Sequence, residues 1–430
     1  MGLRLGHQYV EWARVFGVRL LSEQVADLRA VPVRDGEVVS PVSERHEIVC
    51  RTLDLSSLLV DSALAAVQER VSAECDDRRW HVVAFAATAE SRCATTLLRR
   101  PRPIVAVTRR VVIAGAAGRD FHDFNTVFRG DSDSEVVAFT QSHDQNVGVL
   151  SEQPERRYPP ELAGEGYPDG IPIVPERDLE ATIRDRDADE VLLSYSDLSH
   201  EAVMHLASRA LAAGADFRIV GPDEMMLDLD LPVVAVDAVR TGCGKSQAAR
   251  AITAALDERG HDPVAVREPM PYGDLAEQAV MRFETMADLD AAGVTVEERE
   301  EFEQYVDRGH VVFAGVDYGR IADAVRDEGA DVLVWDGGNN ELPFYRPDVH
   351  FVLADPLRAG HERRYHPGET NLRLADYVVV NKENAADPDD VDTVVENARE
   401  ANPDAEVIHA DSVVTVPADA AIEGKRVLAV

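Results

Sequence analysis

Lysine and cysteine are scarce in this chain. Of its 44 basic residues only three are lysines, at Lys245, Lys382 and Lys425. The four cysteines, Cys50, Cys75, Cys93 and Cys243, show no paired Cys-x-x-Cys spacing, so the sequence predicts neither a disulfide framework nor a zinc cage. No apolar run is long enough to cross a bilayer, and Met1 is not followed by a signal-peptide pattern. We therefore expect a cytoplasmic protein with no membrane partner.

Basic residues of either kind are also few compared with acidic residues. The 430-residue chain has a net charge of −35 at pH 7 and an ordinary hydrophobic fraction of 45%. Nucleic acid is excluded as an expected partner, because phosphate contacts need lysine and arginine. An acidic, lysine-poor composition without disorder indicates a halophilic protein, since high salt screens the self-repulsion of such a charge.

The acidic residues are unevenly distributed. Residues 1–110 hold 14 Asp and Glu against 16 Arg, so all of the net negative charge lies in residues 111–430. The segment 1–108 has one plausible amphipathic helix, over 55–71, and no motif that carries chemistry. Two interpretations of this atypical extension stay open: a small accessory domain, or upstream sequence joined by a wrongly chosen start codon, with Val107 as a candidate true start. We favour the second, and disorder is a further interpretation of the same segment.

Apolar strands alternate with helices from residue 109 onward. This alternation is typical of an α/β fold whose parallel sheet is covered on both faces. The pattern predicts a Rossmann-like domain over 109–226, a linker over 227–232 and a P-loop NTPase domain over 233–430. In the first domain we expect strands at 111–114, 136–139, 190–195 and 217–222, a helix after Phe121 and a helix over 199–213. In the second we expect strands at 233–236, 264–267, 332–336, 350–354 and 377–380, a helix over 246–259 and an acid-rich helical stretch over 276–307.

A phosphate-binding loop follows the strand 233–236. The loop Thr241-Gly242-Cys243-Gly244-Lys245-Ser246-Gln247 leads into a helix, and its glycines let backbone N–H groups close on phosphate oxygens. We expect Lys245 to bind the terminal phosphates and Ser246 to bind Mg²⁺. Val239 replaces the first glycine of the usual motif, and the Thr-Gly-x-Gly-Lys-Ser core resembles the deviant P-loop of dethiobiotin synthetase and its relatives.

Two carboxylates are candidates for holding Mg²⁺ beside this loop. Asp336 ends the apolar strand 332–335 and precedes Gly337-Gly338, a position that suits a metal ligand near the phosphates. Asp237 is the weaker candidate, as a ligand or as a group that orients metal-bound water. A plain Asp-Gly turn is the alternative for Asp336.

A second nucleotide motif is incomplete. Asn381-Lys382-Glu383-Asn384 resembles the Asn-Lys-x-Asp motif that reads purines, with Asn384 in place of the aspartate that accepts two bonds from guanine. We therefore expect ATP rather than GTP, with Asn381 and Lys382 beside the base. A polar turn after a strand is the alternative.

Arginines and histidines form a third group of candidates. Arg240 in the loop and Arg267 at a strand end are, with Lys245 and Asp336, the expected catalytic residues, because guanidinium groups match phosphates. Further arginines that could hold a polyanionic substrate are Arg119, Arg358, Arg363 and Arg364. A structural salt bridge is the alternative for each arginine. His200 is either a proton-transfer group or part of a helix start capped by Ser199, and the spacing of His361 and His366 argues against a metal site.

Residues 109–430 resemble the archaeal cyclic 2,3-diphosphoglycerate synthetase family. The most specific segments are Arg-Thr-Gly-Cys-Gly-Lys-Ser at 240–246 and Trp-Asp-Gly-Gly-Asn-Asn at 335–340. The resemblance implies an ATP-dependent ligase that closes an intramolecular phosphoanhydride in 2,3-diphosphoglycerate and releases ADP and phosphate. It also implies that Lys245 and Ser246 hold ATP and Mg²⁺, with Asp336 beside them. Residues 141–155 do not match the family, and 425–430 form an unfinished strand where its members continue.

Three functions therefore remain open. The leading prediction is an ATP-dependent ligase acting on a small phosphorylated anion. A GTPase switch or metallochaperone of the same P-loop class is the second, and it predicts a cluster of Cys or His ligands. The third is a truncated nucleotide-binding remnant without turnover. Whether the chain forms a homo-oligomer is also left open.

Overall fold

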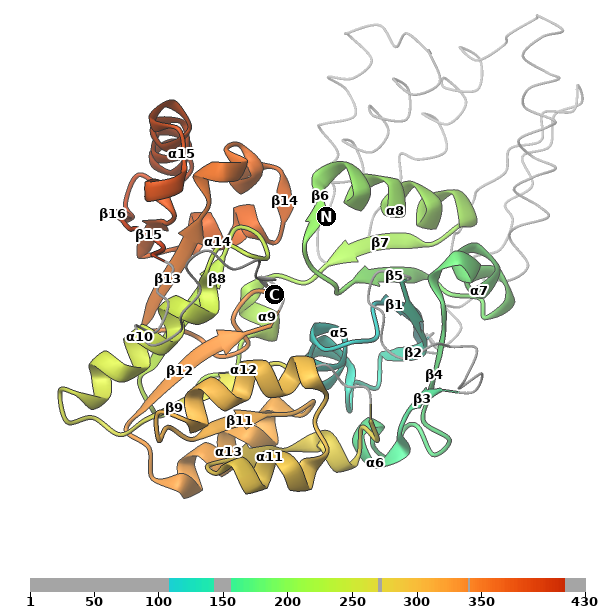
Figure 1. The fold of residues 1–430 in the computed structure, drawn as a ribbon. Helices are drawn as coiled ribbons and strands as arrows, with labels where there is room; N and C mark the ends of the chain where they lie inside the picture. Colours follow the sequence, from blue (N-terminus) through green and yellow to red (C-terminus); the bar gives the residue numbers. More distant parts are fainter. Residues whose placement is uncertain (1–107, 143–155, 270–272, 339–340, 414–430) are drawn as a thin grey trace, which may run out of the picture. The chain divides into compact units, whose positions relative to one another are not determined.

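The computed structural model describes residues 108–142, 156–269, 273–338 and 341–413 (Figure 1). The chain divides into two units, 1–100 and 101–430, and every described residue lies in the second. The predicted helix over 55–71, nearly all of the segment 141–155 and the terminal strand over 425–430 lie outside the described residues.

The first part of this unit is built on a six-stranded sheet in the order β3-β4-β2-β1-β5-β7. Its strands are β1 (Arg109–Ala114), β2 (Ser134–Gln141), β3 (Arg157–Tyr158), β4 (Ile171–Pro175), β5 (Glu190–Leu193) and β7 (Asp216–Ile219). All neighbours are parallel except β3 and β4. Successive side chains of β1 belong to two different hydrophobic cores. Val111 and Ile113 pack on one face of the sheet, and Val112 and Ala114 pack on the other. The predicted parallel sheet with two covered faces is confirmed.

Short helices connect these strands. They are α5 (Arg119–Asp123), which continues into a π-helical turn (Phe124–Phe128), α6 (Pro160–Ala163), α7 (Leu179–Asp185), α8 (His200–Ala213) and α9 (Pro222–Met225). The predicted helix α8 is confirmed, with the Ser199 hydroxyl accepting the Ala202 N–H at 3.1 Å and Gly214 ending it at φ 104°. The predicted strand 217–222 is too long at its end, because Pro222 begins α9 instead.

The second part is built on an eight-stranded sheet in the order β10-β11-β9-β12-β8-β13-β15-β16. Its strands are β8 (Val233–Ala238), β9 (Pro263–Arg267), β10 (Met281–Phe283), β11 (Val312–Ala314), β12 (Val332–Gly337), β13 (Val349–Ala354), β15 (Tyr377–Val380) and β16 (Glu406–His409). Its helices are α10 (Lys245–Asp257), α11 (Met286–Ala292), α12 (Val296–Val306), α13 (Tyr318–Glu328), α14 (Gly368–Leu374) and α15 (Pro388–Ala401). Only β10 is antiparallel to its neighbour. A small antiparallel pair, β6 (Leu198–Ser199) with β14 (Tyr365–His366), joins the two parts.

The prediction of one acid-rich helical stretch over 276–307 is wrong. A 3-10 turn (Glu277–Ala279) and the strand β10 come first, followed by α11 and α12 as separate helices. Each helix has its own capping box, with Thr285 and Asp288 starting α11 and Thr295 and Glu298 starting α12. Two such starts in ten residues break the continuous helix.

The predicted linker over 227–232 is attached to the second part. Leu227 forms a bridge with Tyr345, and Leu229 and Leu231 pack against the buried core. The alternation of Asp and Leu thus places leucines inward along an extended segment.

The strand order positions the site. In the second sheet β8 lies between β12 and β13, and β9 lies beyond β12 (Figure 1). Since these strands are parallel, the phosphate loop after β8, Asp336 near the end of β12 and Arg267 at the end of β9 meet at one edge.

Candidate active site

The phosphate loop ends in an uncapped helix start. Gly242 and Gly244 have φ values of 83° and 104°, and Gly244 occupies the N-cap of α10 with no side-chain cap. The first N–H groups of α10 therefore have no partner within the helix, which makes this end a site for an anion. A side chain at Gly244 is also excluded, because its Cβ would lie 2.4 Å from Asn381 Nδ2. The loop geometry fits the predicted phosphate site.

Lys245 and Asp336 contact each other at this helix start. The Lys245 ammonium donates to Asp336 Oδ1 at 3.0 Å and also to the Asp336 backbone carbonyl. The Tyr305 hydroxyl donates to Asp336 Oδ2 at 2.8 Å. Asp336 is fully buried, whereas the Lys245 side chain keeps 11% exposure. The two residues that were expected to handle the terminal phosphates and the metal are thus adjacent.

Arg267 is the buried counter-ion of Asp336. Its Nη1 donates to Asp336 Oδ2 and, at 2.9 Å, to Ser246 Oγ, while Nη2 donates to Glu301. Burial alone would raise the pKa of Asp336, but the charges of Arg267 and Lys245 outweigh it and hold that pKa below its usual value. Asp336 is therefore an ionised carboxylate. The predicted catalytic role of Arg267 remains a prediction, and its contacts are those of a residue that positions Asp336.

The donor set at this edge fits Mg²⁺. Magnesium is commonly held by one or two carboxylates together with substrate phosphates. Ser246 Oγ and the Asp336 carboxylate are both hydrogen-bonded to Arg267 Nη1, so they lie within reach of one ion. Asp237 is held elsewhere: its Oδ2 contacts His350 Nε2 at 3.0 Å, and both side chains are buried.

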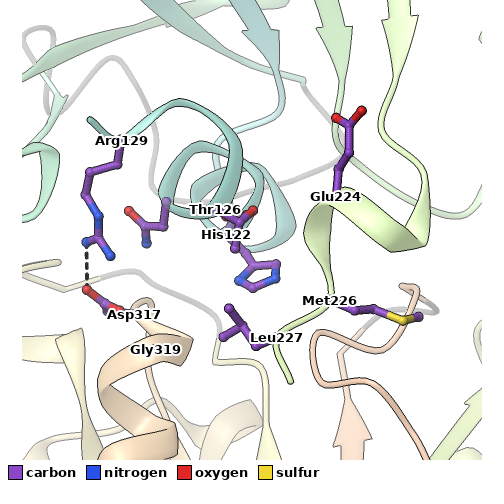
Figure 2. Close-up of a pocket in the computed structure, with 9 residues that line it drawn as sticks. His122, Thr126, Arg129, Glu224, Met226, Leu227, Asp317 and Gly319 are labelled. Carbon is purple, nitrogen blue, oxygen red and sulfur yellow. Dashed lines mark hydrogen bonds and ion pairs between the residues drawn. The ribbon is translucent and has the colours of Figure 1, made fainter. Parts of the chain in front are cut away.

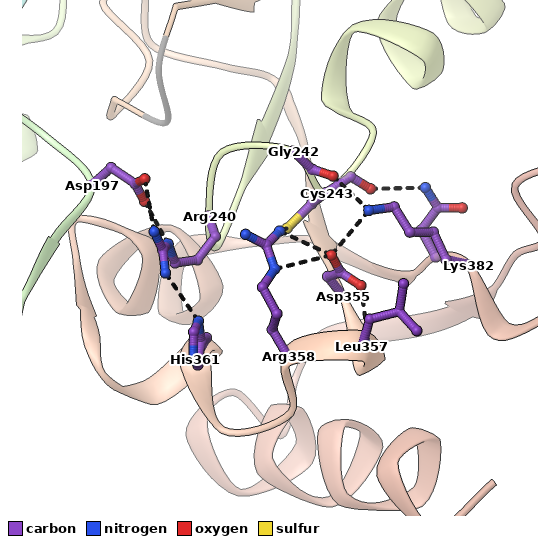
Figure 3. Close-up of polar contacts among 10 residues, drawn as sticks. Asp197, Arg240, Gly242, Cys243, Asp355, Leu357, Arg358, His361 and Lys382 are labelled. Carbon is purple, nitrogen blue, oxygen red and sulfur yellow. Dashed lines mark hydrogen bonds and ion pairs between the residues drawn. The ribbon is translucent and has the colours of Figure 1, made fainter. Parts of the chain in front are cut away.

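Asn381 and Lys382 support the phosphate loop. The Asn381 amide donates to the Cys243 carbonyl at 2.8 Å, and the Lys382 ammonium donates to the Gly242 carbonyl at 2.6 Å and to Asp355 at 3.0 Å (Figure 3). Arg358 donates to the same Asp355 carboxylate at 2.9 Å. Their predicted place beside a purine base remains a prediction. Asn384, at the position that would read guanine, is bonded through both its oxygen and its nitrogen to the backbone of Ser412.

Arg240 extends from the loop to the first part of the unit. Its guanidinium donates to Asp197 Oδ1 at 2.9 Å and Oδ2 at 3.2 Å and lies 3.0 Å from His361 Nδ1 (Figure 3). The same guanidinium stacks on Tyr365 at 3.8 Å. The predicted catalytic role of Arg240 remains a prediction.

Several of the remaining arginine and histidine candidates lie near one another. Burial and the charges of Arg240, Arg358 and Arg364 lower the pKa of His361, and burial and the charges of Arg119 and His200 lower the pKa of His366. The buried Arg119 lies 3.5 Å from Asp123, and Arg363 forms a surface pair with Glu400. His200 lies at the start of α8, 3.6 Å from Glu369, which accords with the Ser199 capping interpretation. Binding of a polyanionic substrate by these arginines remains a prediction.

Four site residues were missed in the sequence. Tyr305 and Glu301, on α12, contact Asp336 and Arg267 respectively. Glu268 and Glu341 form a buried carboxyl pair within the electrostatic reach of Lys245. The only local signal was position, since Glu268 follows Arg267 at a strand end and Glu341 follows the Gly-Gly-Asn-Asn run.

A cavity of about 280 Å³ lies apart from the loop (Figure 2). Its lining is His122, Asn125, Thr126, Arg129, Glu224, Met226, Leu227, Asp317 and Gly319. Arg129 and Asp317 form an ion pair of 2.8 Å at its edge, and His122 stacks on Phe344. None of the predicted site residues lines this cavity.

Two general searches bear on function. Over the described ranges, no three His, Cys, Asp or Glu side chains are grouped so as to hold a metal ion. In the same ranges, no helix has both the length and the apolar character needed to cross a bilayer.

Comparison with known proteins gives one extensive sequence match. The chain is 54% identical over 322 residues to the arginine synthetase ArcE of Thermococcus kodakarensis, a match that covers 75% of this chain and 70% of that protein. No family model matches. Among solved structures, LpxK of Aquifex aeolicus in complex with ATP aligns with 36% of this chain and 49% of its own, at 16% identity and a TM-score of 0.27. The MinC:MinD complex of Aquifex aeolicus aligns with 42% of this chain and 80% of its own, at 14% identity and a TM-score of 0.25. The sequence match establishes the relationship: the chain belongs to the family of arginine synthetase ArcE.

Proposed function

We propose that this protein is an ATP-dependent ligase. The observation that carries the proposal is the contact of Lys245 with Asp336 at the uncapped start of α10. Ligases of this type transfer the γ-phosphoryl group to an oxygen of a second substrate and then exchange the phosphate for a nucleophile. Phosphoryl transfer of this kind depends mainly on positioning and on cations, which is what this edge of the sheet supplies.

Each loop residue has a role in that proposal. The N–H groups of residues 241–247 and the Lys245 ammonium bind the phosphates of ATP. Ser246 and Asp336 would hold Mg²⁺, and the ion would supply positive charge near the phosphate oxygens. Arg267 and Tyr305 keep the Asp336 carboxylate oriented through their hydrogen bonds. Asn381 and Lys382 hold the loop carbonyls and so fix its curvature.

The product supported best is a guanidino compound of the arginine type. The support is the 54% identity to a protein named arginine synthetase, over three quarters of this chain. Chemically, such a product arises when the carbonyl oxygen of a ureido group is phosphorylated and then replaced by a nitrogen. The acidic surroundings of the site suit a nitrogenous substrate, since Glu268 and Glu341 lie near Lys245.

Cyclic 2,3-diphosphoglycerate is the second candidate product. The segments 240–246 and 335–340 favour it, because they resemble the synthetases of that compound. A bisphosphate would need several free cations, whereas Arg119, Arg240 and Arg267 each already contact an aspartate. We therefore rank it below the guanidino product.

One assay separates these functions. The full chain is incubated with Mg²⁺ and ATP in molar KCl, because its acidic composition supports adaptation to high salt. ADP release is then measured with ammonium plus the ureido counterpart of arginine, with 2,3-diphosphoglycerate alone, and with neither. Stimulation by the first mixture, with arginine formed in equal amount, supports the proposal. Stimulation by 2,3-diphosphoglycerate selects the cyclic product, preference for GTP supports a switch, and no stimulation contradicts ligase activity.

A further inference from the structure

A buried carboxyl pair lies where the two parts of the unit meet. Glu268 directly follows β9, and Glu341 lies beyond the end of β12, so both approach the same edge as Lys245. Glu268 lies against two glycines: a Cβ on Gly118 would be 1.6 Å from its Oε1, and a Cβ on Gly338 would be 2.0 Å from its Oε2. Glycine at these positions thus leaves the space that the Glu268 carboxyl occupies.

The pKa of each carboxyl group of the pair is raised above its usual value. Burial raises the pKa of Glu268 well above its usual value, and the neighbouring Glu341 charge raises it further. Burial also raises the pKa of Glu341, although hydrogen bonds from Ser196 and Glu268 oppose that rise. Glu268 is therefore the member of the pair that holds a proton more readily. Two carboxylates in contact share a proton for the same reason in other buried pairs.

Two buried polar atoms at the pair have no hydrogen-bond partner among the residues that the structure describes. Glu341 is 6% exposed, and while its Oε1 accepts from Ser196 at 2.7 Å, no N–H or hydroxyl donor reaches its Oε2. The hydroxyl of Tyr318, a residue that is 1% exposed, is also without a partner. The charges of both glutamates act on Tyr318, so its hydroxyl lies near the pair. A buried acceptor and a buried hydroxyl left open together indicate that a ligand with N–H donors completes the arrangement.

We propose that the Glu268–Glu341 pair binds the attacking nitrogen of the second substrate, as ammonium or an amine, and accepts a proton from it. The inference rests on the proposed ligase function and adds the residues that select a nitrogen nucleophile. Lys245 lies within electrostatic reach of the pair, so phosphorylation and attack occur side by side. Asp120 adds a further carboxyl near Glu268, and it disfavours an anionic nucleophile at this place.

The chemical step balances within the substrates. Ammonium gives one proton to the Glu341 carboxylate and becomes ammonia. The nitrogen lone pair forms a bond to the carbon whose oxygen ATP has phosphorylated. The bond between that carbon and oxygen breaks, phosphate leaves with the electron pair, and the phosphate takes a second proton from the newly bound nitrogen, which becomes an NH2 of the guanidinium group. The proton held by the glutamates then passes to solvent, and no oxidant or reductant is needed.

Two isosteric variants test the assignment. In Glu341→Gln the negative charge is lost, so we expect the KM for ammonium to rise about 10- to 100-fold while the affinity for ATP is unchanged. In Glu268→Gln one carboxyl of the pair is lost but the amide can still donate to Glu341, so we expect the KM for ammonium to rise less than in Glu341→Gln. Glu362→Gln is the matched control, because Glu362 is also buried and bonded, to Asn397, but lies away from the pair. Thermal unfolding in the same salt verifies that each variant folds.

A binding measurement separates failure of the inference from failure of the ligase proposal. Arginine is titrated into the full chain by calorimetry, without ATP, for the wild type and for Glu341→Gln. Ammonium-dependent turnover with an unchanged KM in Glu341→Gln overturns the inference and leaves the ligase standing. Arginine binding that weakens tenfold or more in Glu341→Gln supports the inference even if no ligase turnover is found. If ligase turnover is absent, the inference is overturned when arginine binds both proteins equally well or binds neither.

Discussion

Arg240 of the phosphate loop lies against Asp197 of the β5–β6 connection through two hydrogen bonds, of 2.9 and 3.2 Å (Figure 3). The same guanidinium stacks on Tyr365 at 3.8 Å. The phosphate loop is thereby joined to the part of the unit built on the first sheet. Movement of Arg240 toward a bound phosphate would break this pair, so we expect the Asp197 contact and nucleotide binding to be coupled.

This relationship predicts non-additive effects of substitution. We expect Arg240→Ala and Asp197→Ala each to reduce the free energy of unfolding, and the double variant to lose less than the sum, with a coupling of about 0.5–3 kcal/mol. Denaturant unfolding of the four proteins in molar KCl measures the coupling. Strict additivity would show that the two hydrogen bonds contribute nothing. The neighbouring surface pair Arg363 and Glu400 is a suitable control cycle, for which about 0.2–1 kcal/mol is expected.

Lys245→Ala should abolish turnover while leaving the fold intact. The ammonium contacts Asp336 at the helix start, and removal of one such group at a phosphoryl-transfer site costs about 10²- to 10³-fold in rate. ATP binding and ADP release are measured for the variant and for Arg259→Ala. Arg259 is an exposed cation just beyond α10, bonded to Ala255, so its removal tests for a general effect of charge. Equal activity of wild type and Lys245→Ala would remove the basis of the proposed function.

Local patterns predicted the phosphate loop and the strands around it. The order of strand, glycine loop and helix is encoded within residues 233–257, and Asp336 was found because its strand and glycines are contiguous. The Glu268–Glu341 pair was not found, because it forms only when β9 and β12 lie side by side and the Gly118 turn closes over them. Contacts between residues this far apart in the sequence produce no periodic pattern that could be recognised in it.

The error over 276–307 has a different cause. A signal was present, since Thr285 and Thr295 are each followed three residues later by an acid, the pattern of a capping box. The many acidic residues gave a helical propensity that obscured both starts. Propensity summed over a long window thus conceals a boundary that two specific residues define.

Arg267→Met should destabilise the fold strongly. The change leaves the buried Asp336 carboxylate without its main counter-ion, and breaking a buried pair in this way costs about 3–5 kcal/mol. Glu301 is the outer partner of Arg267, and the Glu301 side chain is 38% exposed. Glu301→Gln should therefore lower the free energy of unfolding by about 1 kcal/mol or less. Unfolding midpoints of both variants give the comparison. Equal losses would contradict the assignment of Arg267 as the residue that compensates Asp336.

Gly118→Ala should displace the Glu268 carboxyl. The added Cβ would overlap Glu268 Oε1, so we expect a loss of about 1–3 kcal/mol of unfolding free energy, as for other overpacked sites. Gly166→Ala is the matched control, because no atom lies within 4 Å of its Cβ position, and its effect should stay within about 0.5 kcal/mol. A Gly118→Ala protein as stable as the control would mean that Glu268 moves at no cost.

The pH dependence of stability provides the last prediction, through His366. Its ring nitrogen Nε2 is buried without a partner, and burial, followed by the charges of Arg119 and His200, lowers its pKa to about 3. The unfolded chain binds a proton at His366 near pH 6.5, so this contribution to stability is complete above about pH 6.5 and is lost as the pH falls toward 3. The pKa of Asp120 is raised to about 6, so Asp120 changes the stability in the opposite direction. Asp120 is present in both the wild type and His366→Gln, so its effect cancels when the two proteins are compared.

In His366→Gln the unfolding free energy should therefore vary less steeply with pH, by about 1.4 kcal/mol per unit near pH 5. The difference between the two proteins at about pH 8, where both side chains are neutral, measures the packing change alone. Parallel curves for wild type and variant from pH 4 to about 7 would contradict a neutral, buried His366.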